Sequence, residues 1–415
     1  MEPGVSAAPS PDVTHPLQGA RIILAVSGGI AAYKAADLAS KLVQSGAVVE
    51  VILTAGGQEF VRPLTFQALT KRAVHTDTFA PWTGTSFGHI TLAREAELMI
   101  VAPASANTIA KLALGLADDL LGAVALSTEA PLLLAPAMEH GMYHHPATQE
   151  HLATLLQRGA TVVGPESGRL ASGYEGDGRL VPVETILGRA RALLGRDGPL
   201  AGKHVVVTAG GTREPLDPVR FVGNRSSGTM GYALAQAAID RGAEVTLITT
   251  TTLSPPVSAA IVAVETAEQM RAAVEQAITG ADVLIMAAAV ADFRPDQPQQ
   301  RKIKKRPDQH VMDLRLTQNP DIVASIDRPG LLKVGFAAET DDLVANARAK
   351  LTAKGLAMIV ANDVVDTIGS AESVATIILP DRPLDELPRM SKQRLAAEIV
   401  ARLLPLLDPE ETAGA

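Results

Sequence analysis

The sequence predicts an α/β protein built from two doubly wound, Rossmann-like domains. Apolar runs of strand length alternate with amphipathic, helix-like stretches along the chain. Two of these runs end in a glycine turn followed by a helical pattern, at Ser27-Gly28-Gly29 and again at Gly210-Gly211. The two turns lie roughly one domain length apart, and 415 residues suffice for two hydrophobic cores.

The composition narrows the class of protein. Hydrophobic residues make up 47% and charged residues 20% of the chain, as expected of a globular protein. A net charge of −8 and only 3% aromatic residues disfavour nucleic acid or an anionic membrane as partner. Cysteine is absent, which excludes disulfides, cysteine-based zinc sites and a thiol nucleophile. No apolar run is long enough to cross a bilayer and no signal-peptide core is present, so we expect a cytoplasmic protein.

Composition and the apolar pattern also predict the domain limits. Residues 1–18 are expected to form a disordered Pro-rich tail, 19–195 the first domain, 196–203 a linker, 204–406 the second domain, and 407–415 an acidic tail. Continuous apolar runs are typical of parallel strands, so both domains should be stacks of right-handed βαβ units. Ligands then bind at the carboxyl ends of the strands.

The elements are expected in the following order. In the first domain the strands are Arg21–Val26, Val48–Leu53, Leu98–Ala102, Leu132–Ala135 and Thr161–Val163, and the helices are Ala31–Gln44, Thr108–Leu114 and Thr148–Arg158. In the second domain the strands are His204–Thr208, Glu244–Thr249, Ile261–Val264, Asp282–Met286, Lys333–Phe336, Met358–Val360 and Ala375–Leu379, and the helices are Gly231–Arg241, Ala267–Thr279, Leu343–Lys354 and Lys392–Leu406.

The stretch from His204 to Gly231 is the strongest indication of a ligand site. A buried strand leads into Gly210-Gly211, and a polar loop over 212–228 follows before an Ala-rich helix. Backbone N–H groups and a helix N-terminus at such a turn hold anions, and glycine lets the backbone approach them. Most strand-to-helix turns are only turns, but a loop this dense in polar side chains indicates a ligand.

The motifs of both halves resemble, in order, those of the bifunctional coenzyme A biosynthesis family. This family joins phosphopantothenoylcysteine decarboxylase to phosphopantothenate–cysteine ligase, and the resemblance covers residues 19–406. The matching motifs are SGGIAAYK, PASANTIAKLALGLADDL, APAM, GGTREPLDPVRFVGNRSSGTMG, AAAVADF, KIKK, NPDIV and GFAAET.

The resemblance implies a two-step activity. The second half would join 4'-phosphopantothenate to cysteine with CTP and Mg²⁺, through an acyl-cytidylate. The first half, flavodoxin-like and FMN-binding, would then decarboxylate the product to 4'-phosphopantetheine. In the family the N-terminal halves form trimers and the C-terminal halves dimers, which implies a homo-oligomer and, where both contacts form, a dodecamer.

The FMN site is assigned by the same resemblance. His89 matches the family's active-site histidine, although a lone histidine is more often structural. Taken singly, Thr54 and Ser105 would be ordinary turn or cap residues, yet hydroxyls and a helix N-terminus can hold a phosphate without a basic residue. The FMN residues are Ser27, Gly28, Gly29, Thr54, Ser105, Asn107 and Thr108.

In the second half the resemblance assigns catalytic and nucleotide-binding residues. Lys302, in a basic run that would otherwise be a solvated surface segment, matches the nucleotide and activation lysine. Asn224 matches the residue that steadies the acyl-cytidylate, since an amide can donate to a developing oxyanion. The remaining nucleotide residues are Met286, Ala287, Ala288, Asp292, Pro320, Asp321, Ile322, Val323, Phe336, Lys350 and Lys354.

Two points stay open in this half. Arg213, Asp217 and Arg220 share the loop of Asn224, and either arginine could take the substrate phosphate. The sequence does not choose between them, and it does not identify the magnesium ligands.

Two positions depart from the best-known form of the family. Glu139 stands where that form has an asparagine that grips the substrate carboxylate, so we expect it to be protonated, turned away or paired, with His140 as a candidate partner. Ser172 stands where that form has a cysteine that protonates the ene-thiol, and a hydroxyl is too weak an acid to replace it directly. Tyr174, His144 or a water relayed through Ser172 are the candidate donors.

Two other functions were weighed against the bifunctional enzyme. The N-terminal half could be a non-catalytic FMN-binding scaffold for oligomerisation, as in regulatory subunits that share this fold, but those lose the histidine that His89 matches. An NAD(P) oxidoreductase is the second alternative, and neither glycine turn continues as G-x-G-x-x-G.

Overall fold

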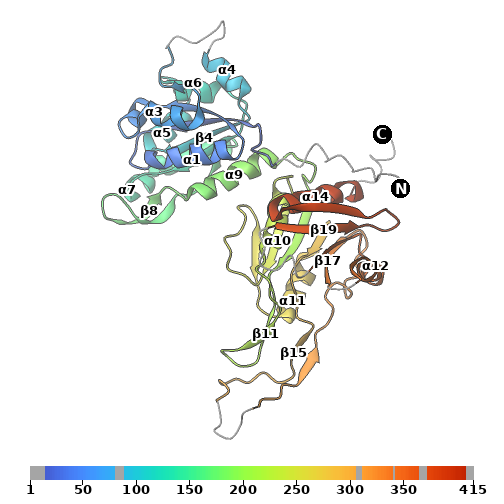
Figure 1. Ribbon diagram of the computed structural model, residues 1–415. Coiled ribbons are helices and arrows are strands. Elements are labelled where there is room, and N and C mark those ends of the chain that lie inside the picture. Colours follow the sequence, from blue (N-terminus) through green and yellow to red (C-terminus); the bar gives the residue numbers. More distant parts are fainter. Residues whose placement is uncertain (1–14, 80–87, 305–310, 340–341, 364–371, 408–415) are drawn as a thin grey trace. The chain divides into compact units, whose positions relative to one another are not determined.

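The computed structural model describes residues 15–79, 88–304, 311–339, 342–363 and 372–407. These residues form two compact units that divide between Gly195 and Arg196 (Figure 1). Each unit is an α/β sheet with a hydrophobic core of its own, as the sequence predicts. Within the described ranges, no helix combines the length and the apolar character needed to cross a bilayer.

The first unit is built on a six-stranded parallel sheet in the order β3-β2-β1-β4-β5-β6. Its strands are β1 (Arg21–Val26), β2 (Val48–Leu53), β3 (Val74–His75), β4 (Leu98–Ala104), β5 (Leu132–Pro136) and β6 (Thr161–Val162). Without the two-residue β3, the other five strands have the order 2-1-3-4-5 that is typical of flavodoxin-like sheets. The predicted fold is therefore confirmed, and β3 was missed because it is too short to show a pattern.

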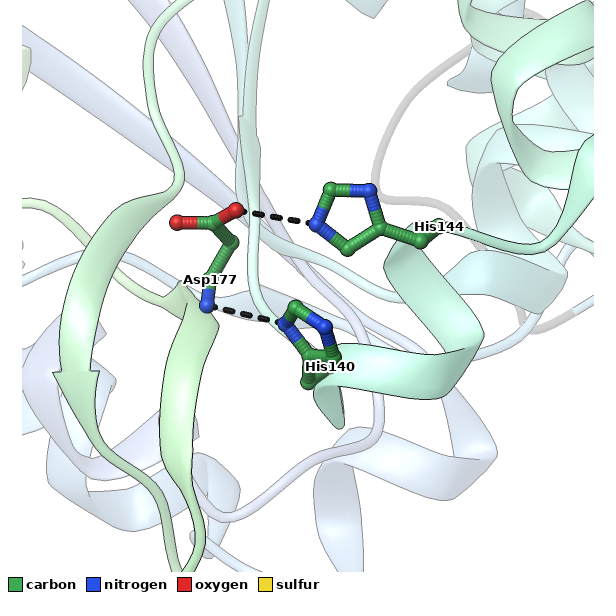
Figure 2. A group of neighbouring side chains, drawn as sticks. All are labelled: His140, His144 and Asp177. Atoms are coloured by element: carbon green, nitrogen blue, oxygen red, sulfur yellow. Dashed lines mark hydrogen bonds and ion pairs between the residues drawn. The ribbon is translucent and has the colours of Figure 1, made fainter.

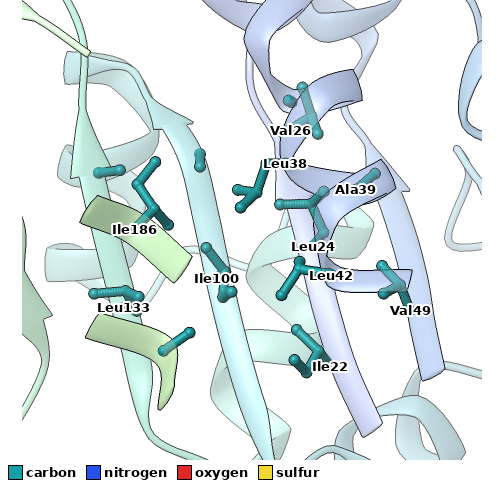
Figure 3. Packing of buried hydrophobic residues seen from close by; sticks show 14 of the residues in the cluster. Ile22, Leu24, Val26, Leu38, Ala39, Leu42, Val49, Ile100, Leu133 and Ile186 are labelled. Carbon is teal, nitrogen blue, oxygen red and sulfur yellow. The ribbon is translucent and has the colours of Figure 1, made fainter. Parts of the chain in front are cut away.

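Helices connect the strands of this sheet and pack on it. They are α1 (Ala32–Gln44), α2 (Ala55–Gln58), α3 (Pro63–Thr70), α4 (Gly88–Glu95), α5 (Ala106–Leu114), α6 (Leu120–Ser127), α7 (His140–Tyr143), α8 (Pro146–Gln157) and α9 (Val183–Gly195). Figure 3 shows Leu24 of β1 and Ile100 of β4 packed with Leu38 and Leu42 of α1 and with Ile186 of α9. Full burial of each such side chain stabilises the folded unit by about 1.5–3 kcal/mol. This packing holds β1 and α1 together and so fixes the turn between them.

The chain is ordered before the predicted start of the first domain. Leu17 is fully buried in this core, and the N–H of Gly19 donates to the carbonyl oxygen of Gly46 at 2.9 Å. The disordered tail expected over residues 1–18 is therefore too long, because residues 15–18 pack on the unit. Leu17 is a single apolar residue in a Pro-rich segment, so no periodic pattern marked it.

A small antiparallel hairpin stands outside the main sheet. It consists of β7 (Glu166–Arg169) and β8 (Glu175–Arg179). The sequence analysis predicted no strands here, because these segments are glycine-rich and polar and show no apolar alternation. The hairpin carries Ser172 in its turn.

The second unit is built on an eight-stranded sheet in the order β13-β12-β9-β14-β17-β18-β19-β20. Its strands are β9 (His204–Ala209), β12 (Glu244–Thr249), β13 (Ala260–Ala263), β14 (Val283–Met286), β17 (Leu332–Glu339), β18 (Met358–Asp363), β19 (Glu372–Ile378) and β20 (Asp385–Ser391). The expectation of parallel strands throughout was wrong at one edge, since β19 is antiparallel to both β18 and β20. The sequence did not reveal β20 because only Leu387 and Met390 of this polar strand are buried.

Each helix expected in the second unit is present. These are α10 (Thr229–Ile239), α11 (Ala267–Ala277), α12 (Leu343–Ala353) and α14 (Lys392–Leu407). Met270 of α11 and Ala347 of α12 share one core, whereas α10 and α14 pack on each other. The N-termini of α10 and α14 follow the sheet edge at which the parallel strands end.

Two further hairpins form an arm that extends away from the second sheet (Figure 1). The arm consists of β10 (Arg213–Pro215) paired with β11 (Phe221–Gly223), and of β15 (Phe293–Pro295) paired with β16 (Leu316–Gln318). Strand β10 lies beside β15. Phe221 and Phe293 are 55% and 50% exposed on the arm, so it presents apolar surface.

Candidate functional site

The residues expected to bind FMN gather at one edge of the first sheet. Strands β2, β1 and β4 are neighbours, and Thr54, Ser27 and Ser105 follow their carboxyl ends. The connections reverse direction between β1 and β4, which is where doubly wound sheets bind ligands. The fold thus brings together residues that lie far apart in the sequence.

Ser27 ties two of these strand ends together. Its Oγ donates to the carbonyl oxygen of Pro103 at 2.7 Å and accepts from the N–H of Ser105 at 3.0 Å. The side chain is buried, so its hydroxyl joins the two strand ends from inside the unit. Its role is therefore to position the loops of the site.

Two other hydroxyls cap helices at the same edge. Thr54 Oγ1 accepts from the N–H of Gly57 at 3.1 Å and caps α2. Ser105 Oγ accepts from the N–H of Thr108 at 3.3 Å and caps α5. Asn107, in the first turn of α5, is exposed at the edge. The interpretation of Thr54 and Ser105 as cap residues is therefore confirmed, and their role in binding FMN stays a prediction.

The glycine turn after β1 packs directly on the turn after β2. A Cβ on Gly28 would lie 2.9 Å from the carbonyl carbon of Gly56, so no larger residue fits there. A Cβ on Gly29 would meet nothing within 4 Å, which leaves this part of the turn open. An open glycine turn beside two helix N-termini fits the phosphate of a flavin nucleotide.

His89 stands in the first turn of α4 and is half buried. Helix α4 packs on α6. In the part of the chain that the structure describes, no hydrogen bond joins His89 to the Ser27–Ser105 edge. The structure therefore places the histidine on a separate element, and its catalytic role stays a prediction.

A cluster of side chains joins α7 to the β7–β8 hairpin (Figure 2). His144 Nε2 lies 2.9 Å from Asp177 Oδ2, and the backbone N–H of Asp177 donates to His140 Nδ1 at 3.1 Å. The ring of Tyr174 packs on His140 with the centroids 5.4 Å apart. A Cβ on Gly176 would lie 2.7 Å from His140 Nδ1, so glycine permits this close approach. The cluster fixes the hairpin to the helix.

The same cluster has two further features, a carboxyl with a shifted pKa and three possible metal-ligand atoms. The hydrogen bond from His144 lowers the pKa of Asp177. One ligand atom from each of His140, His144 and Asp177 lies within 4.8 Å of the other two, as in sites that hold divalent ions. The existing hydrogen bonds already satisfy these atoms, so the cluster is first of all a structural joint.

The two departures from the family pattern lie on either side of this joint. Glu139 is the N-cap residue of α7, and within the described ranges it forms no ion pair. Among the described residues no ion pair joins Glu139 to His140, whose Nδ1 accepts from the N–H of Asp177, so a protonated or outward-turned Glu139 stays the expectation. Ser172 is exposed in the hairpin turn, where its Oγ accepts from the N–H of Tyr174 at 3.2 Å.

The second unit contains a cavity of about 920 Å³ where its parallel strands end. Asn224 lines it, and so does every residue expected to bind the nucleotide with the exception of Lys302. These residues are Met286, Ala287, Ala288, Asp292, Pro320, Asp321, Ile322, Val323, Phe336, Lys350 and Lys354. The cavity therefore assembles five segments that the sequence keeps apart.

Asn224 is fixed against the loop that follows β14. Its Nδ2 donates to the carbonyl oxygen of Val290 at 2.9 Å. The other amide hydrogen and the amide oxygen remain for a ligand. A Cβ on Gly211 would lie 2.4 Å from the carbonyl oxygen of Asn224, so the glycine turn allows this approach.

Three buried polar residues that sequence analysis missed hold the same loop. Thr208 Oγ1 accepts from the N–H of Ala288 at 3.1 Å, and Thr212 Oγ1 accepts from the N–H of Ala291 at 2.9 Å. Asn319 Nδ2 donates to the carbonyl oxygen of Ala291 at 2.8 Å. Thr212 and Asn319 belong to the matched motifs, whereas the only signal for Thr208 is a polar side chain in an apolar strand.

Charged groups line one side of the cavity. Lys354 Nζ lies 2.8 Å from Asp321 Oδ2, and Lys350 lies one helical turn earlier on α12. Burial pushes the pKa of Asp321 upward, but the hydrogen bond and charge of Lys354 and the backbone N–H groups of Ala324 and Val323 together outweigh it and lower the pKa. Asp292 is exposed, and its carbonyl oxygen accepts from the N–H of Asn319 at 2.8 Å. Two cations and two carboxylates thus face the space expected to hold a nucleotide.

Lys302 lies on the arm and does not line the cavity of its own chain. The N–H of Ile303 donates to Asp217 Oδ2 at 3.1 Å, and Arg220 Nη1 donates to the carbonyl oxygen of Ile303 at 3.4 Å. Asp217 follows β10 near the tip of its hairpin. A rise of about 3.3 Å per residue places this tip roughly 10 Å from Asn224.

The two arginines proposed for the substrate phosphate are both engaged on the arm. Arg220 Nη1 lies 3.3 Å from Asp217 Oδ2. The guanidinium of Arg213 lies over the ring of Phe221, 5.4 Å from its centroid. Neither arginine is among the described residues that line the cavity.

Family models match both halves of the chain. Residues 11–195 match the Flavoprotein family. Residues 200–406 match the DNA/pantothenate metabolism flavoprotein C-terminal domain.

Relatives and solved structures match in the same way. The coenzyme A biosynthesis bifunctional protein CoaBC of Bacillus subtilis (strain 168) is 45% identical over 404 residues, which covers 94% of this chain and 98% of that protein. The protein of the same name from Mycobacterium tuberculosis (strain ATCC 25618 / H37Rv) is 43% identical over 417 residues, covering 95% and 99%.

A crystal structure of the C-terminal domain of a coenzyme A biosynthesis bifunctional protein is 38% identical, with a TM-score of 0.44, and covers 51% of this chain and 99% of its own. A mutant PPC decarboxylase complexed with pantothenoylaminoethenethiol is 32% identical, with a TM-score of 0.39, and covers 42% and 97%. Because relatives match it over nearly the full length and family models match both halves, the chain belongs to the family of coenzyme A biosynthesis bifunctional proteins.

Proposed function

We propose that the chain carries out two consecutive steps of coenzyme A biosynthesis. The C-terminal unit joins 4'-phosphopantothenate to cysteine at the expense of CTP, and the N-terminal unit decarboxylates the product to 4'-phosphopantetheine. The observation that carries this proposal is the cavity of the second unit, lined by all but one of the residues expected to bind a nucleotide. Family membership over both halves supports it.

In the ligase cavity the residues have distinct roles. Lys350 and Lys354 attract the triphosphate, and Phe336 packs against the nucleotide. Asn224 donates its second amide hydrogen to the oxyanion that develops when the carboxylate is activated and when cysteine attacks. Mg²⁺ would neutralise phosphate charge there, and Asp292 suits it as an exposed carboxylate without an ion pair among the described residues.

In the decarboxylase unit the edge after β1, β2 and β4 holds the flavin. The turn at Gly28 and Gly29 and the N-termini of α2 and α5 bind its phosphate through backbone N–H groups. When bound, FMN supplies the acceptor and donor of electrons that the reaction requires. His89 assists proton movement at the substrate. The β7–β8 hairpin carries Tyr174 and Ser172, the other candidates for supplying a proton to the substrate.

We place Lys302 at the cavity of a second copy. The lysine lies on the arm, outside its own cavity, and the arm presents exposed Phe221 and Phe293 that an interface would cover. A homo-oligomer, expected from the family, would let one arm complete the neighbouring site. Such an enzyme would work in the cytoplasm, where CTP and cysteine are available.

The test of this function is a ligase assay with Lys302→Gln. Loss of a positioned cation should reduce amide formation by about 10²–10³-fold while the flavin stays bound. Mixing this variant with Asn224→Asp before assembly should restore part of the activity, because mixed oligomers contain one site with both native residues. Near-normal turnover of Lys302→Gln would show that the basic run is only solvated surface. Inactive mixtures would show that Lys302 serves its own chain.

A further inference from the structure

The wall of the ligase cavity contains two polar residues that the proposed reaction does not use. Ser373, near the start of β19, and Lys392, the first residue of α14, both line the cavity. They reach the cavity because β19 runs antiparallel to β18, so its start lies where the parallel strands end.

Both side chains are buried, and the described residues do not satisfy them. Ser373 is 1% exposed, and its Oγ has no hydrogen-bond partner among the described residues. Lys392 is 8% exposed and has neither a hydrogen bond nor an ion pair within the described ranges. Burial lowers the pKa of the Lys392 ammonium, as expected of a cation without a counterion. Buried cations of this kind are normally paired, so the pair of residues indicates a missing anionic partner.

The N-terminus of α10 lines the same cavity. Gly228 is its N-cap residue and offers no side-chain oxygen. The first-turn N–H groups of Met230 and Gly231 have no acceptor within the helix and lie at the cavity wall. A group with several anionic oxygens can bind these N–H groups, an ammonium and a hydroxyl at once.

We propose that Lys392, Ser373 and the N-terminus of α10 form an anion subsite that binds a phosphate group of a substrate. The inference rests on the ligase function proposed above and adds two binding residues to it. Either the nucleotide triphosphate or the phosphate of 4'-phosphopantothenate can supply this group. A phosphate is favoured over the cysteine carboxylate because it carries more negative charge and more anionic oxygens for an ammonium, a hydroxyl and helix N–H groups that line one cavity.

The experiment is direct binding by calorimetry on the full-length protein. CTP, inorganic pyrophosphate, 4'-phosphopantothenate and cysteine are titrated separately into the wild type and into Lys392→Met, Lys392→Arg and Ser373→Ala. Lys203→Met is the matched control, since Lys203 precedes β9 at the opposite end of the strands. Thermal unfolding without ligand reports folding of each variant.

We expect Lys392→Met to weaken at least one phosphate ligand by about tenfold or more, and Ser373→Ala to weaken the same ligand less. Lys392→Arg should retain most of the affinity, and Lys203→Met all of it. Weakening of CTP and pyrophosphate assigns the subsite to the nucleotide, and weakening of 4'-phosphopantothenate alone assigns it to that substrate. Without ligand, Lys392→Met should unfold at the wild-type temperature or above, because the buried charge is gone.

Wild-type affinity of Lys392→Met for every phosphate ligand would overturn the inference, and so would an effect on cysteine alone. If Lys392→Met does not fold, Ser373→Ala decides: unchanged phosphate binding contradicts the subsite. A wild type that binds neither CTP nor 4'-phosphopantothenate would instead refute the proposed ligase function.

Discussion

Single side chains at strand ends serve the fold and the site together. Thr54 and Ser105 cap helices, and in doing so they set backbone N–H groups toward the flavin edge. Asn224 donates one amide hydrogen to the carbonyl oxygen of Val290, and its other amide hydrogen remains for a ligand. A substitution at such a residue therefore acts both on the loop and on the ligand.

Asn224→Asp should impair ligation far more than CTP binding. The new carboxylate would face the carbonyl oxygen of Val290 and would also repel the developing oxyanion. We expect turnover at saturating CTP to fall by about 10²-fold or more, with CTP affinity changed much less. Steady-state kinetics and calorimetry measure the two quantities. A large loss of CTP affinity with normal turnover would instead place Asn224 in the nucleotide site.

At this scale the sequence predicted the exposed part of the site better than the buried part. Asp292 and Asp321 belong to motifs that could be matched, and both line the cavity. Thr208 and Lys392 could not be chosen, because they lie outside the matched motifs and their importance lies in being polar and buried. Burial of a polar side chain depends on tertiary packing, which no local pattern reports.

At the scale of elements, the long apolar strands were predictable and the short polar hairpins were not. The strands of both sheets appear where continuous apolar runs occur, whereas β7, β8, β10, β11, β15 and β16 carry little periodic pattern. The hairpins are held by specific side chains, Asp177 with His144 in one unit and Asp217 with Ile303 in the other. The hairpins carry Ser172 and Lys302, so the least predictable elements hold two catalytic candidates.

Asp217→Asn should misplace the arm and reduce ligation. The amide nitrogen would meet the N–H of Ile303 donor against donor, so the segment that carries Lys302 would lose its anchor. We expect about 10-fold to 100-fold slower ligation with CTP affinity retained. Asp296→Asn is the matched control, since its exposed carboxylate lies on the same arm 3.5 Å from Arg315. Equal rates for both variants would show that the anchor does not matter.

The pH dependence of this anchor has a definite sign. Burial pushes the pKa of Asp217 upward, but the backbone N–H groups of Ile303, Val219 and Arg220 outweigh it and lower the pKa. A carboxyl whose folded-state pKa is depressed stabilises the fold at pH values above its ordinary pKa. That stability is lost as the pH falls through the folded-state value. Wild type should therefore lose arm order in acid, and Asp217→Asn should lack that transition.

At the scale of the whole molecule, two units with separate cores share one chain. The division at Gly195 predicts that residues 15–195, expressed alone, fold and retain FMN. A fragment that starts at residue 20 loses the buried Leu17, and we expect it to be less stable by about 1.5–3 kcal/mol. Denaturant unfolding and the flavin absorption spectrum check both points. A folded but colourless 15–195 fragment that ignores added FMN would contradict the assignment of the flavin edge.

Both units should be catalytic in a chain that has Glu139 and Ser172 at the two altered positions. Full-length protein is incubated with 4'-phosphopantothenate, cysteine, CTP and Mg²⁺, and carbon dioxide and 4'-phosphopantetheine are followed separately. We predict that wild type releases both, and that His89→Asn makes phosphopantothenoylcysteine without releasing carbon dioxide. Wild-type protein that accumulates phosphopantothenoylcysteine and releases no carbon dioxide would contradict the claim and leave the N-terminal unit as a flavin-binding scaffold.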